Sequence, residues 1–275
     1  MSVRVTPVTA MIGATIEGVD LHAPLEPDDQ KAIASALLEH GVIFFRDQPL
    51  TPDEHVAFAE QFGAIGVSPI SADADMRPEV LVLDQVSPEG EGADNWHSDN
   101  TFMPEPPLGS ILRAVQLPPV GGDTCFANAV AGYEALSDSM RRFVDELHAV
   151  HDITKPMRRA IRAGLFDEAK LAELQKQWPP VEHPVARTHP VSGRKALYVN
   201  GNSTTHLVGL SERENDLLLP FLNDHIRSPA FQCRFQWQVG SIAFWDNRIV
   251  QHYAVPDYTE RRVMHRVTLT GDKPF

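Results

Sequence analysis

The sequence predicts a mainly β protein with flanking helices, built on a closed or sandwiched antiparallel sheet. Apolar segments of strand length recur along most of the chain, glycines and scattered prolines separate them, and the helix signals cluster in the first quarter. Short strands separated by Gly and Pro, with few helices between them, are typical of antiparallel sandwiches and barrels. A jelly roll, the double-stranded β-helix of cupin-like proteins, fits this pattern.

Four segments carry helix signals. The first has proline at its opening position and Gly41 just past its end, the usual places of these residues at helix termini. The second and third open with capping boxes headed by Thr51 and Ser211, each followed three residues later by glutamate. The fourth lies inside a polar insertion. The predicted helices span residues 27–40, 51–63, 211–225 and 166–178.

The other apolar segments indicate short strands. The sequence shows no internal repeat, no low-complexity segment and no linker rich in Gly, Ser or Pro. We therefore expect residues 1–275 to form a single domain, with a helical insertion around residues 155–180. The predicted strands span residues 42–46, 79–86, 110–117, 124–128, 186–189, 196–200, 231–238, 242–245, 251–255 and 262–270.

The charge balance limits the classes of partner. Lysine and arginine total 24 against 37 aspartates and glutamates, a formal net charge of −13. Nucleic acid and anionic membrane surfaces require a basic face, so neither is expected as the main partner. A small organic anion is compatible with this charge, because a focused arginine pocket can reverse the sign of the potential locally.

Cysteine usage and the N-terminal sequence predict a cytoplasmic protein. Cys125 and Cys233 are too few for a disulfide framework and are expected to be reduced core residues. The first residues show no basic segment followed by an apolar stretch, so no signal peptide is expected. No apolar run approaches the roughly 18 residues that a membrane helix requires.

Two separated motifs form a candidate metal site: Trp96-His97-Ser98-Asp99 and, far along the chain, Gln251-His252-Tyr253. On a strand, His97 and Asp99 would point to the same face. Two imidazoles and one carboxylate are the donors of the facial triad that binds Fe(II) and leaves positions open for a co-substrate and O2. The alternative is a hydrogen-bonded histidine beside a turn aspartate, since a bare His-x-Asp is common by chance.

Two arginines near the C-terminus suggest anionic ligands. Arg262 and Arg266 would share one face of a strand, while His265 between them faces the other way and is expected to be structural. Guanidinium groups on an inward face are costly to bury without anions. A dicarboxylate co-substrate would give one arginine a bidentate partner, and an anionic primary substrate could occupy the other. The alternative is an exposed edge strand that carries both arginines.

Motifs spread along the chain carry a family resemblance. The chain resembles the taurine dioxygenase (TauD/TfdA) family of Fe(II)/2-oxoglutarate-dependent dioxygenases over nearly its whole length, with order and spacing kept. This family also contains phenoxyacetate-herbicide and alkyl-sulfate dioxygenases. The motifs are Ile12-Gly13-Ala14, Gly18-Val19-Asp20-Leu21, Phe44-Phe45-Arg46-Asp47-Gln48, Asn95-Trp96-His97-Ser98-Asp99, Gly121-Gly122-Asp123-Thr124, Tyr133-Glu134-Ala135-Leu136, Trp245-Asp246-Asn247-Arg248 and Arg261-Arg262-Val263-Met264-His265-Arg266.

The resemblance implies roles for individual residues. His97, Asp99 and His252 would hold Fe(II), with 2-oxoglutarate and O2 as co-substrates. Arg262 and the hydroxyl of Thr124 would bind the distal carboxylate of 2-oxoglutarate. A carboxylate at Asp99 also separates this chain from the halogenating relatives, which lack it.

The substrate side of the resemblance is less complete. Arg266 would face the anionic group of the primary substrate, and the other pocket positions implied are Asn95, Ser68, Ser71 and Ser203. The taurine enzyme has a His and a Tyr at the two serines after Gly63, an Asn at Ala93 and an aromatic residue at Ser203. Each hydrogen bond lost to a bound anion should reduce the free energy of taurine binding by about 1–3 kcal/mol.

The resemblance thus implies hydroxylation of a small organic anion. The most direct expectation is a taurine-type sulfonate, with taurine giving aminoacetaldehyde and sulfite beside succinate and CO2. The alternatives are an alkyl-sulfate or carboxylate (phenoxyacetate-like) dioxygenase with the same iron centre, and a non-catalytic jelly roll that binds a metal or small molecule. Relatives form dimers or tetramers, so a homo-oligomer is expected.

Overall fold

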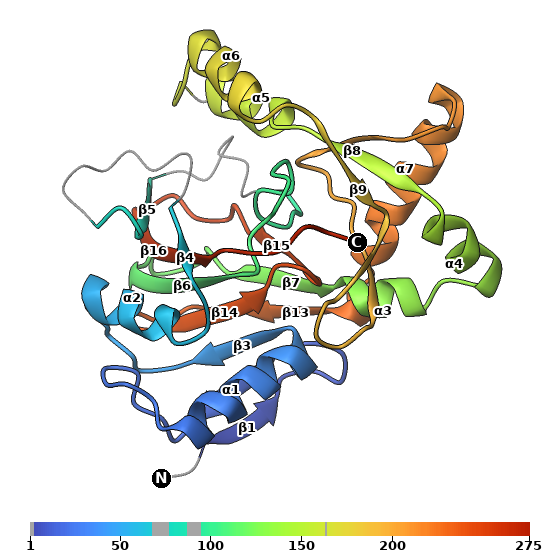
Figure 1. Ribbon diagram of the computed structural model, residues 1–275. Helices are drawn as coiled ribbons and strands as arrows, with labels where there is room; N and C mark the ends of the chain where they lie inside the picture. The colour runs from blue at the N-terminus through green and yellow to red at the C-terminus, as the bar shows by residue number, and fades with distance from the viewer. Residues whose placement is uncertain (1–2, 68–76, 87–94, 163) are drawn as a thin grey trace.

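The larger of the two sheets that form the core runs through most of the molecule. The computed structural model describes residues 3–67, 77–86, 95–162 and 164–275 (Figure 1). Within them, an eight-stranded sheet has the order β1-β2-β3-β14-β6-β16-β4, and β5 pairs with β16. Its strands are β1 (Arg4–Pro7), β2 (Ala14–Glu17), β3 (Val42–Phe45), β4 (Ile65–Gly66), β5 (Leu81–Gln85), β6 (Gly109–Gln116), β14 (Ile242–Asp246) and β16 (Arg262–Leu269).

A smaller antiparallel sheet closes the sandwich. It has the order β13-β7-β15, and its strands are β13 (Gln232–Phe235), β7 (Thr124–Asn128) and β15 (Val250–Ala254). Apolar side chains from both sheets form one buried cluster, in which Phe44 of β3 stacks on Phe235 of β13 with ring centroids 4.1 Å apart. Two sheets around a shared core, antiparallel except for the parallel pair β2–β3, confirm the predicted jelly roll.

Two helices cover the outer face of the large sheet: α1 (Pro27–His40) and α2 (Pro52–Glu60). Side chains alternate along β3, so that Phe44 joins the core between the sheets and Phe45 joins a second cluster under these helices. The capping box of α2 is present, since the Thr51 side chain accepts from the Glu54 backbone and the Glu54 carboxylate accepts from the Thr51 backbone. The helix ends at Glu60, three residues before the predicted end.

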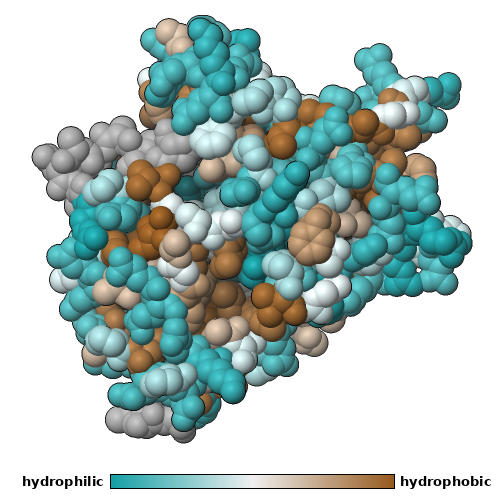
Figure 2. All heavy atoms as spheres, in the orientation of Figure 1, coloured by the Kyte–Doolittle hydropathy of each residue, from teal (hydrophilic) through white to brown (hydrophobic). Residues whose placement is uncertain are grey.

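The insertion contains α5 (Thr154–Arg162) and α6 (Glu168–Gln177), which lie at the top of Figure 1, far from α1. The predicted helix over 166–178 corresponds to α6, whereas α5 was not predicted, because arginines, a lysine and Pro156 leave it few apolar positions. The side chains of Met157 and Leu171 pack in a small cluster under these helices. Their outer surface is mostly hydrophilic (Figure 2).

The insertion is flanked by short strands and further helices. The sheet β12-β8-β9 and the pair β10-β11 lie here. The sequence did not predict six strands of four residues or fewer, β1, β2, β4, β8, β9 and β12. The remaining elements are α3 (Ala129–Glu134), α4 (Asp138–Asp145), β8 (His148–His151), β9 (Val181–Pro184), β10 (Ala186–Thr188), β11 (Lys195–Leu197), β12 (Thr204–Leu207), α7 (Glu212–Ile226) and the 3-10 helix η1 (Pro229–Phe231).

The predictions for the cysteines and for membrane helices are also tested. Both cysteines are free; Cys233 is buried and Cys125 is half-buried. Among the described residues, no helix combines the length and apolar character needed to cross a bilayer.

Candidate metal centre and its cavity

The two halves of the candidate triad meet through the backbone. His97 and His252 form an isolated antiparallel bridge, with backbone N–H···O distances of 3.0 and 2.8 Å. The Nε2 atoms of the two imidazoles lie 3.7 and 3.8 Å from Oδ1 of Asp99. One donor atom from each residue falls within 4.8 Å of the others, so the three could hold one ion.

The local geometry around Asp99 differs from the prediction in one respect. His97 and Asp99 do not lie on a regular strand, because only His97 pairs with β15 and the chain then enters a turn at Asp99. The following residue, Asn100, has a φ of 49°. The turn brings the Asp99 carboxylate towards the imidazoles. The expected arrangement was a strand on which His97 and Asp99 point to the same face.

Asp99 is held from three sides. Its second carboxylate oxygen, Oδ2, accepts from the Ser110 hydroxyl at 2.8 Å. The side-chain amide of Asn247 accepts from the Asp99 N–H at 2.6 Å and donates to the Asp99 carbonyl at 3.0 Å. These contacts leave Oδ1 facing the imidazoles. Sequence reasoning gave Asn247 no role, although it lies in one of the motifs that carried the resemblance.

The protonation states suit a metal site. The Nδ1 atom of His97 lies 2.7 Å from the carbonyl of Asn95, which assigns the proton to Nδ1 and leaves the Nε2 lone pair towards the centre. Burial lowers the pKa of His97 and lowers that of His252 to about 3, so both rings are neutral at pH 7, as ligation requires. Burial alone would raise the pKa of Asp99, but the Arg266 guanidinium and neighbouring imidazoles outweigh it and hold that pKa well below its usual range.

Two neutral nitrogens and one carboxylate oxygen, all buried, fit Fe(II), which is bound by this donor set with positions left for other ligands. A structural histidine beside a turn aspartate would not require the two rings to converge on one carboxylate oxygen.

The two arginines both lie on β16, which pairs with β6 and β5 and is therefore no exposed edge strand. Arg262 is 3% exposed, and its Nε and Nη2 atoms have no hydrogen-bond partner among the described residues. Burial lowers the pKa of Arg262. A buried guanidinium with unpaired donors favours an anionic ligand. His265 points to the other face, where its Nδ1 lies 3.1 Å from Nη2 of Arg113, consistent with a structural role.

Arg266 lies closer to the metal site than Arg262. Its Nη1 donates to Oδ1 of Asp99 at 2.8 Å, and its Nε has no hydrogen-bond partner among the described residues. The family resemblance implies only a substrate-binding role for this arginine. The structure adds a contact with the carboxylate of the triad.

These residues line one cavity of about 460 Å³. The polar part of its lining carries the triad, Thr124 and both arginines. The apolar part, called the apolar wall below, is formed by Leu81 and Leu83 of β5 together with Ile153, Met157, Ala160 and Phe166. Leu81 pairs with Arg266 across the β5–β16 ladder, so the two parts of the lining adjoin.

The expected substrate residues divide into three groups. Ser203 lines the cavity, and its neighbour Asn202, which sequence reasoning missed, does so too. Asn95 is not among the lining residues; its backbone carbonyl orients His97 and its side chain donates to Asn202 at 3.4 Å. Ser68 and Ser71, like Ala93, lie outside the described residues.

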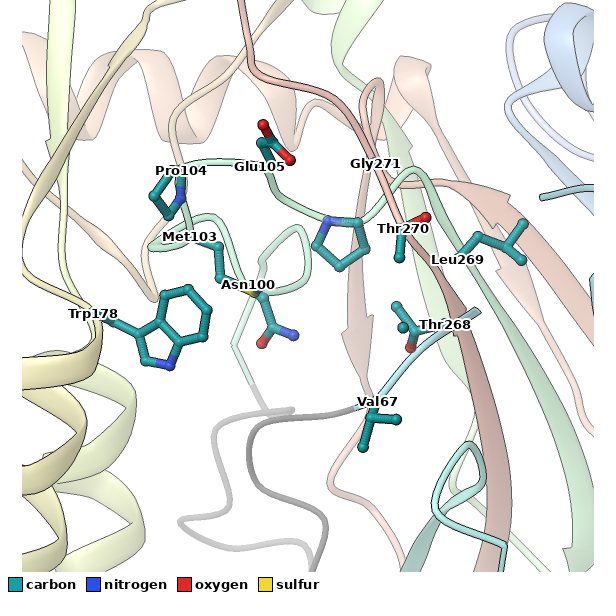
Figure 3. Close-up of a pocket in the computed structure, with 12 residues that line it drawn as sticks. Val67, Asn100, Met103, Pro104, Glu105, Trp178, Thr268, Leu269, Thr270 and Gly271 are labelled. Atoms are coloured by element: carbon teal, nitrogen blue, oxygen red, sulfur yellow. The ribbon is translucent and has the colours of Figure 1, made fainter. Parts of the chain in front are cut away.

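A second cavity, of about 340 Å³, is drawn in Figure 3. It shares Asn100 with the first. Trp178, Met103 and Leu269 line it, with Glu105 as its one charged lining residue among those described. It offers neither a basic side chain for an anion nor a set of metal ligands. The chemistry therefore belongs to the first cavity.

Comparisons with known proteins agree with this geometry. The model of a protein family described as "Taurine catabolism dioxygenase TauD, TfdA family" matches residues 4–268. The chain is 38% identical to an alpha-ketoglutarate-dependent sulfate ester dioxygenase of Pseudomonas putida over 280 residues, covering 100% of this chain and 91% of the relative.

Solved structures are similar along the whole chain. A putative alpha-ketoglutarate-dependent taurine dioxygenase from Burkholderia xenovorans superposes with a TM-score of 0.86 at 40% identity, covering 99% of this chain and 94% of its own. The protein AAD-2, solved in complex with Mn(II) and N-oxalylglycine, gives a TM-score of 0.83 at 29% identity, covering 100% of this chain and 99% of its own.

Proposed function

Because this chain belongs to the TauD, TfdA family and is therefore an Fe(II)- and 2-oxoglutarate-dependent dioxygenase, we propose that it oxidises a small organosulfur anion with an apolar tail. The observation that carries the proposal is one cavity lined both by two arginines and by an apolar wall. A sulfate ester is the first candidate, and a taurine-type sulfonate is the second.

The three donors of the triad, His97, Asp99 and His252, would hold the metal. When bound, Fe(II) supplies O2 activation coupled to decarboxylation of 2-oxoglutarate, which yields succinate and CO2. The protein's own contribution is geometry. Ser110 and Asn247 fix the carboxylate, and the carbonyl of Asn95 fixes the tautomer of the first histidine.

Arg262 and Thr124 would bind the distal carboxylate of 2-oxoglutarate. The guanidinium is buried, two of its donor atoms have no hydrogen-bond partner in the part of the chain that the structure describes, and Thr124 lines the same cavity. A planar guanidinium can donate two parallel hydrogen bonds to one carboxylate. This arrangement would neutralise the buried positive charge of Arg262 only when the co-substrate is present.

Arg266 would bind the sulfate or sulfonate group. It is paired with Asp99 in this structure, but a metal that shares the Asp99 carboxylate leaves the guanidinium with uncompensated positive charge. The unpaired Nε atom is available for an anion. The substrate's anionic group would then lie next to the metal ligands, which brings the adjacent carbon towards the reactive centre.

The apolar wall favours the sulfate ester. An alkyl chain that packs against Met157 and Phe166 gains about 0.8 kcal/mol per buried CH2 group. The ammonium group of taurine would gain nothing there and would lose its hydration. The sulfonate candidate is supported by Arg266, which suits either anion, and by the likeness to the Burkholderia xenovorans structure.

The experiment is a substrate panel with purified protein, Fe(II), 2-oxoglutarate and ascorbate. Octyl sulfate, octanesulfonate, taurine and phenoxyacetate are compared, and succinate, sulfate and sulfite are quantified. Octyl sulfate is expected to give succinate and sulfate in equal amounts. Sulfite from taurine at a higher kcat/KM than sulfate from octyl sulfate would reverse the order of the two candidates, and turnover of phenoxyacetate alone would exclude both.

Self-association and location are proposed on narrower grounds. A homodimer or tetramer is expected from the resemblance, and α7 exposes Leu217 (70%) and Phe221 (45%) about one turn apart, where they could contact another copy. Light scattering after size exclusion measures the mass. Two free cysteines fit a reducing compartment such as the cytoplasm, which cell fractionation would test.

A further inference from the structure

A tryptophan outside the cavity contacts the residue proposed to bind the co-substrate. The indole Nε1 of Trp237 donates to Oγ1 of Thr124 at 3.0 Å, and both side chains are buried. An indole N–H can only donate, whereas a hydroxyl can both donate and accept. The donor chemistry alone therefore sets the direction of this hydrogen bond.

This direction constrains the Thr124 hydroxyl. With one lone pair of Oγ1 engaged by the indole, the hydroxyl proton must point elsewhere, and Thr124 lines the cavity that also holds Arg262. We propose that Trp237 is a positioning residue that orients the Thr124 hydroxyl as a donor to the distal carboxylate of the co-substrate. The inference rests on the proposed roles of Thr124 and Arg262.

The surroundings of Trp237 suit such a role. Phe235 pairs directly with Thr124 across the β13–β7 ladder, so that Trp237 follows two residues beyond the end of β13. Its ring packs edge-on against Phe235, with centroids 4.9 Å apart at 84°, and Phe235 in turn stacks on Phe44. The indole is thus held in a fixed orientation by the core, and the donor position is preformed before a ligand arrives.

An alternative explanation is that the hydrogen bond only satisfies a buried indole N–H. The two explanations differ in ligand selectivity. An oriented hydroxyl strengthens binding only of keto acids that carry the distal carboxylate. A purely structural hydrogen bond affects all keto acids alike, through the stability of the site.

The experiment measures binding rather than turnover. Calorimetric titration of Mn(II)-loaded protein gives Kd for 2-oxoglutarate and for 2-oxovalerate, which lacks the distal carboxylate. For Trp237→Phe we expect Kd of 2-oxoglutarate to rise about threefold to tenfold, with Kd of 2-oxovalerate unchanged. Phe235→Leu is the matched control, because it disturbs the same aromatic cluster without removing the donor, and it should leave the ratio of the two Kd values unchanged.

A second pair of variants separates this inference from the proposed function. Thr124→Val should raise Kd of 2-oxoglutarate by about tenfold, and adding Trp237→Phe to it should cause no further rise. If Thr124→Val leaves that Kd unchanged, the proposed co-substrate site is wrong. If Thr124→Val weakens binding but Trp237→Phe does not, or Trp237→Phe weakens both keto acids equally, the positioning role is overturned.

Discussion

The polar and the apolar parts of the cavity lining are built in different ways. The metal and co-substrate part comes mainly from strands β7, β15 and β16, whose positions are set by backbone ladders on neighbouring strands. The apolar wall comes partly from α5, a helix of nine residues with two buried side chains, Met157 and Ala160. Side-chain contacts attach α5 to β12 and to the turn before it, since Lys155 donates to the Thr204 carbonyl at 2.5 Å and Arg159 donates to the Asn202 side chain.

This difference indicates how reaction and substrate are separated in the fold. Polar atoms that perform the chemistry need fixed positions. The internal strands β7 and β16 supply Thr124 and the two arginines, and β15 with the adjoining bridge and turn supplies the triad. The apolar wall needs only shape, and a short helix outside the main sheets can change shape without moving the metal ligands. The predictions below test this separation, from the largest expected effect to the smallest.

Removal of a metal ligand should abolish the reaction. Asp99→Ala deletes the one carboxylate of the triad and leaves Arg266 without its partner, so substrate-dependent succinate formation should fall by more than about 100-fold. Glu105→Ala, at the second cavity, is the matched control and should retain activity. Full turnover by Asp99→Ala, measured as succinate formed per protein, would show that the metal is not bound at this site.

The two arginines should separate by ligand. Arg262→Ala is expected to raise KM for 2-oxoglutarate and Arg266→Ala to raise KM for the sulfate ester, each by about 10- to 100-fold, because each loses a charge-assisted hydrogen bond to a buried anion. Steady-state kinetics with one ligand varied and the other saturating measure both values. An exchange of the two effects would mean that the assignments are reversed.

Changes in α5 should alter chain-length preference only. Met157→Ala enlarges the cavity beside the apolar wall, and Met157→Trp reduces it. The ratio of kcat/KM for octyl sulfate to kcat/KM for ethyl sulfate should therefore change about threefold to tenfold, in opposite directions in the two variants. The Kd of 2-oxoglutarate serves as the internal control and should stay constant. A rise in that Kd would show that the two parts of the cavity lining are coupled.

Acid should destabilise the fold through the buried His183. The Nε2 atom of His183 lies 2.9 Å from the Thr101 carbonyl and 3.1 Å from that of Met103, in the segment after Asp99. Burial lowers the pKa of His183 to about 4. The unfolded chain, with a pKa near 6.5, binds more protons between these values, so stability falls as the pH drops from about 6.5 to 4.

The loss attributable to His183 should reach at most about 3 kcal/mol. Urea unfolding measures the free energy of unfolding at pH 7 and at pH 5. In His183→Gln the difference between these two free energies should be smaller than in the wild type. An equal pH dependence in wild type and variant would exclude this histidine as a source.

The sequence predicted features that depend on local spacing. Helix caps at Thr51 and Ser211 require only residues three apart, and both capping boxes are present. The shared face of Arg262 and Arg266 follows from the period of a strand. The capping boxes and the arginine face were confirmed. The strand geometry expected for His97 and Asp99 was not, because a turn rather than a strand brings these two side chains together.

Other features arise only from tertiary structure. Asn247 contacts Asp99 across 148 residues, and Trp237 contacts Thr124 across 113. The local sequences of Asn247 and Trp237 do not indicate these partners, and only the fold brings them together. The same is true of the apolar wall, where Met157 and two leucines of β5 line one cavity.

By itself, the sequence thus determined the jelly roll, the reaction class and the metal-ligand candidates, because these depend on residue types at short spacings and on motifs in order. The tertiary structure decided how Asp99 is held, that Arg266 contacts it and which side chains face the substrate. These depend on distances between segments far apart in the chain, which spacing along a sequence does not encode.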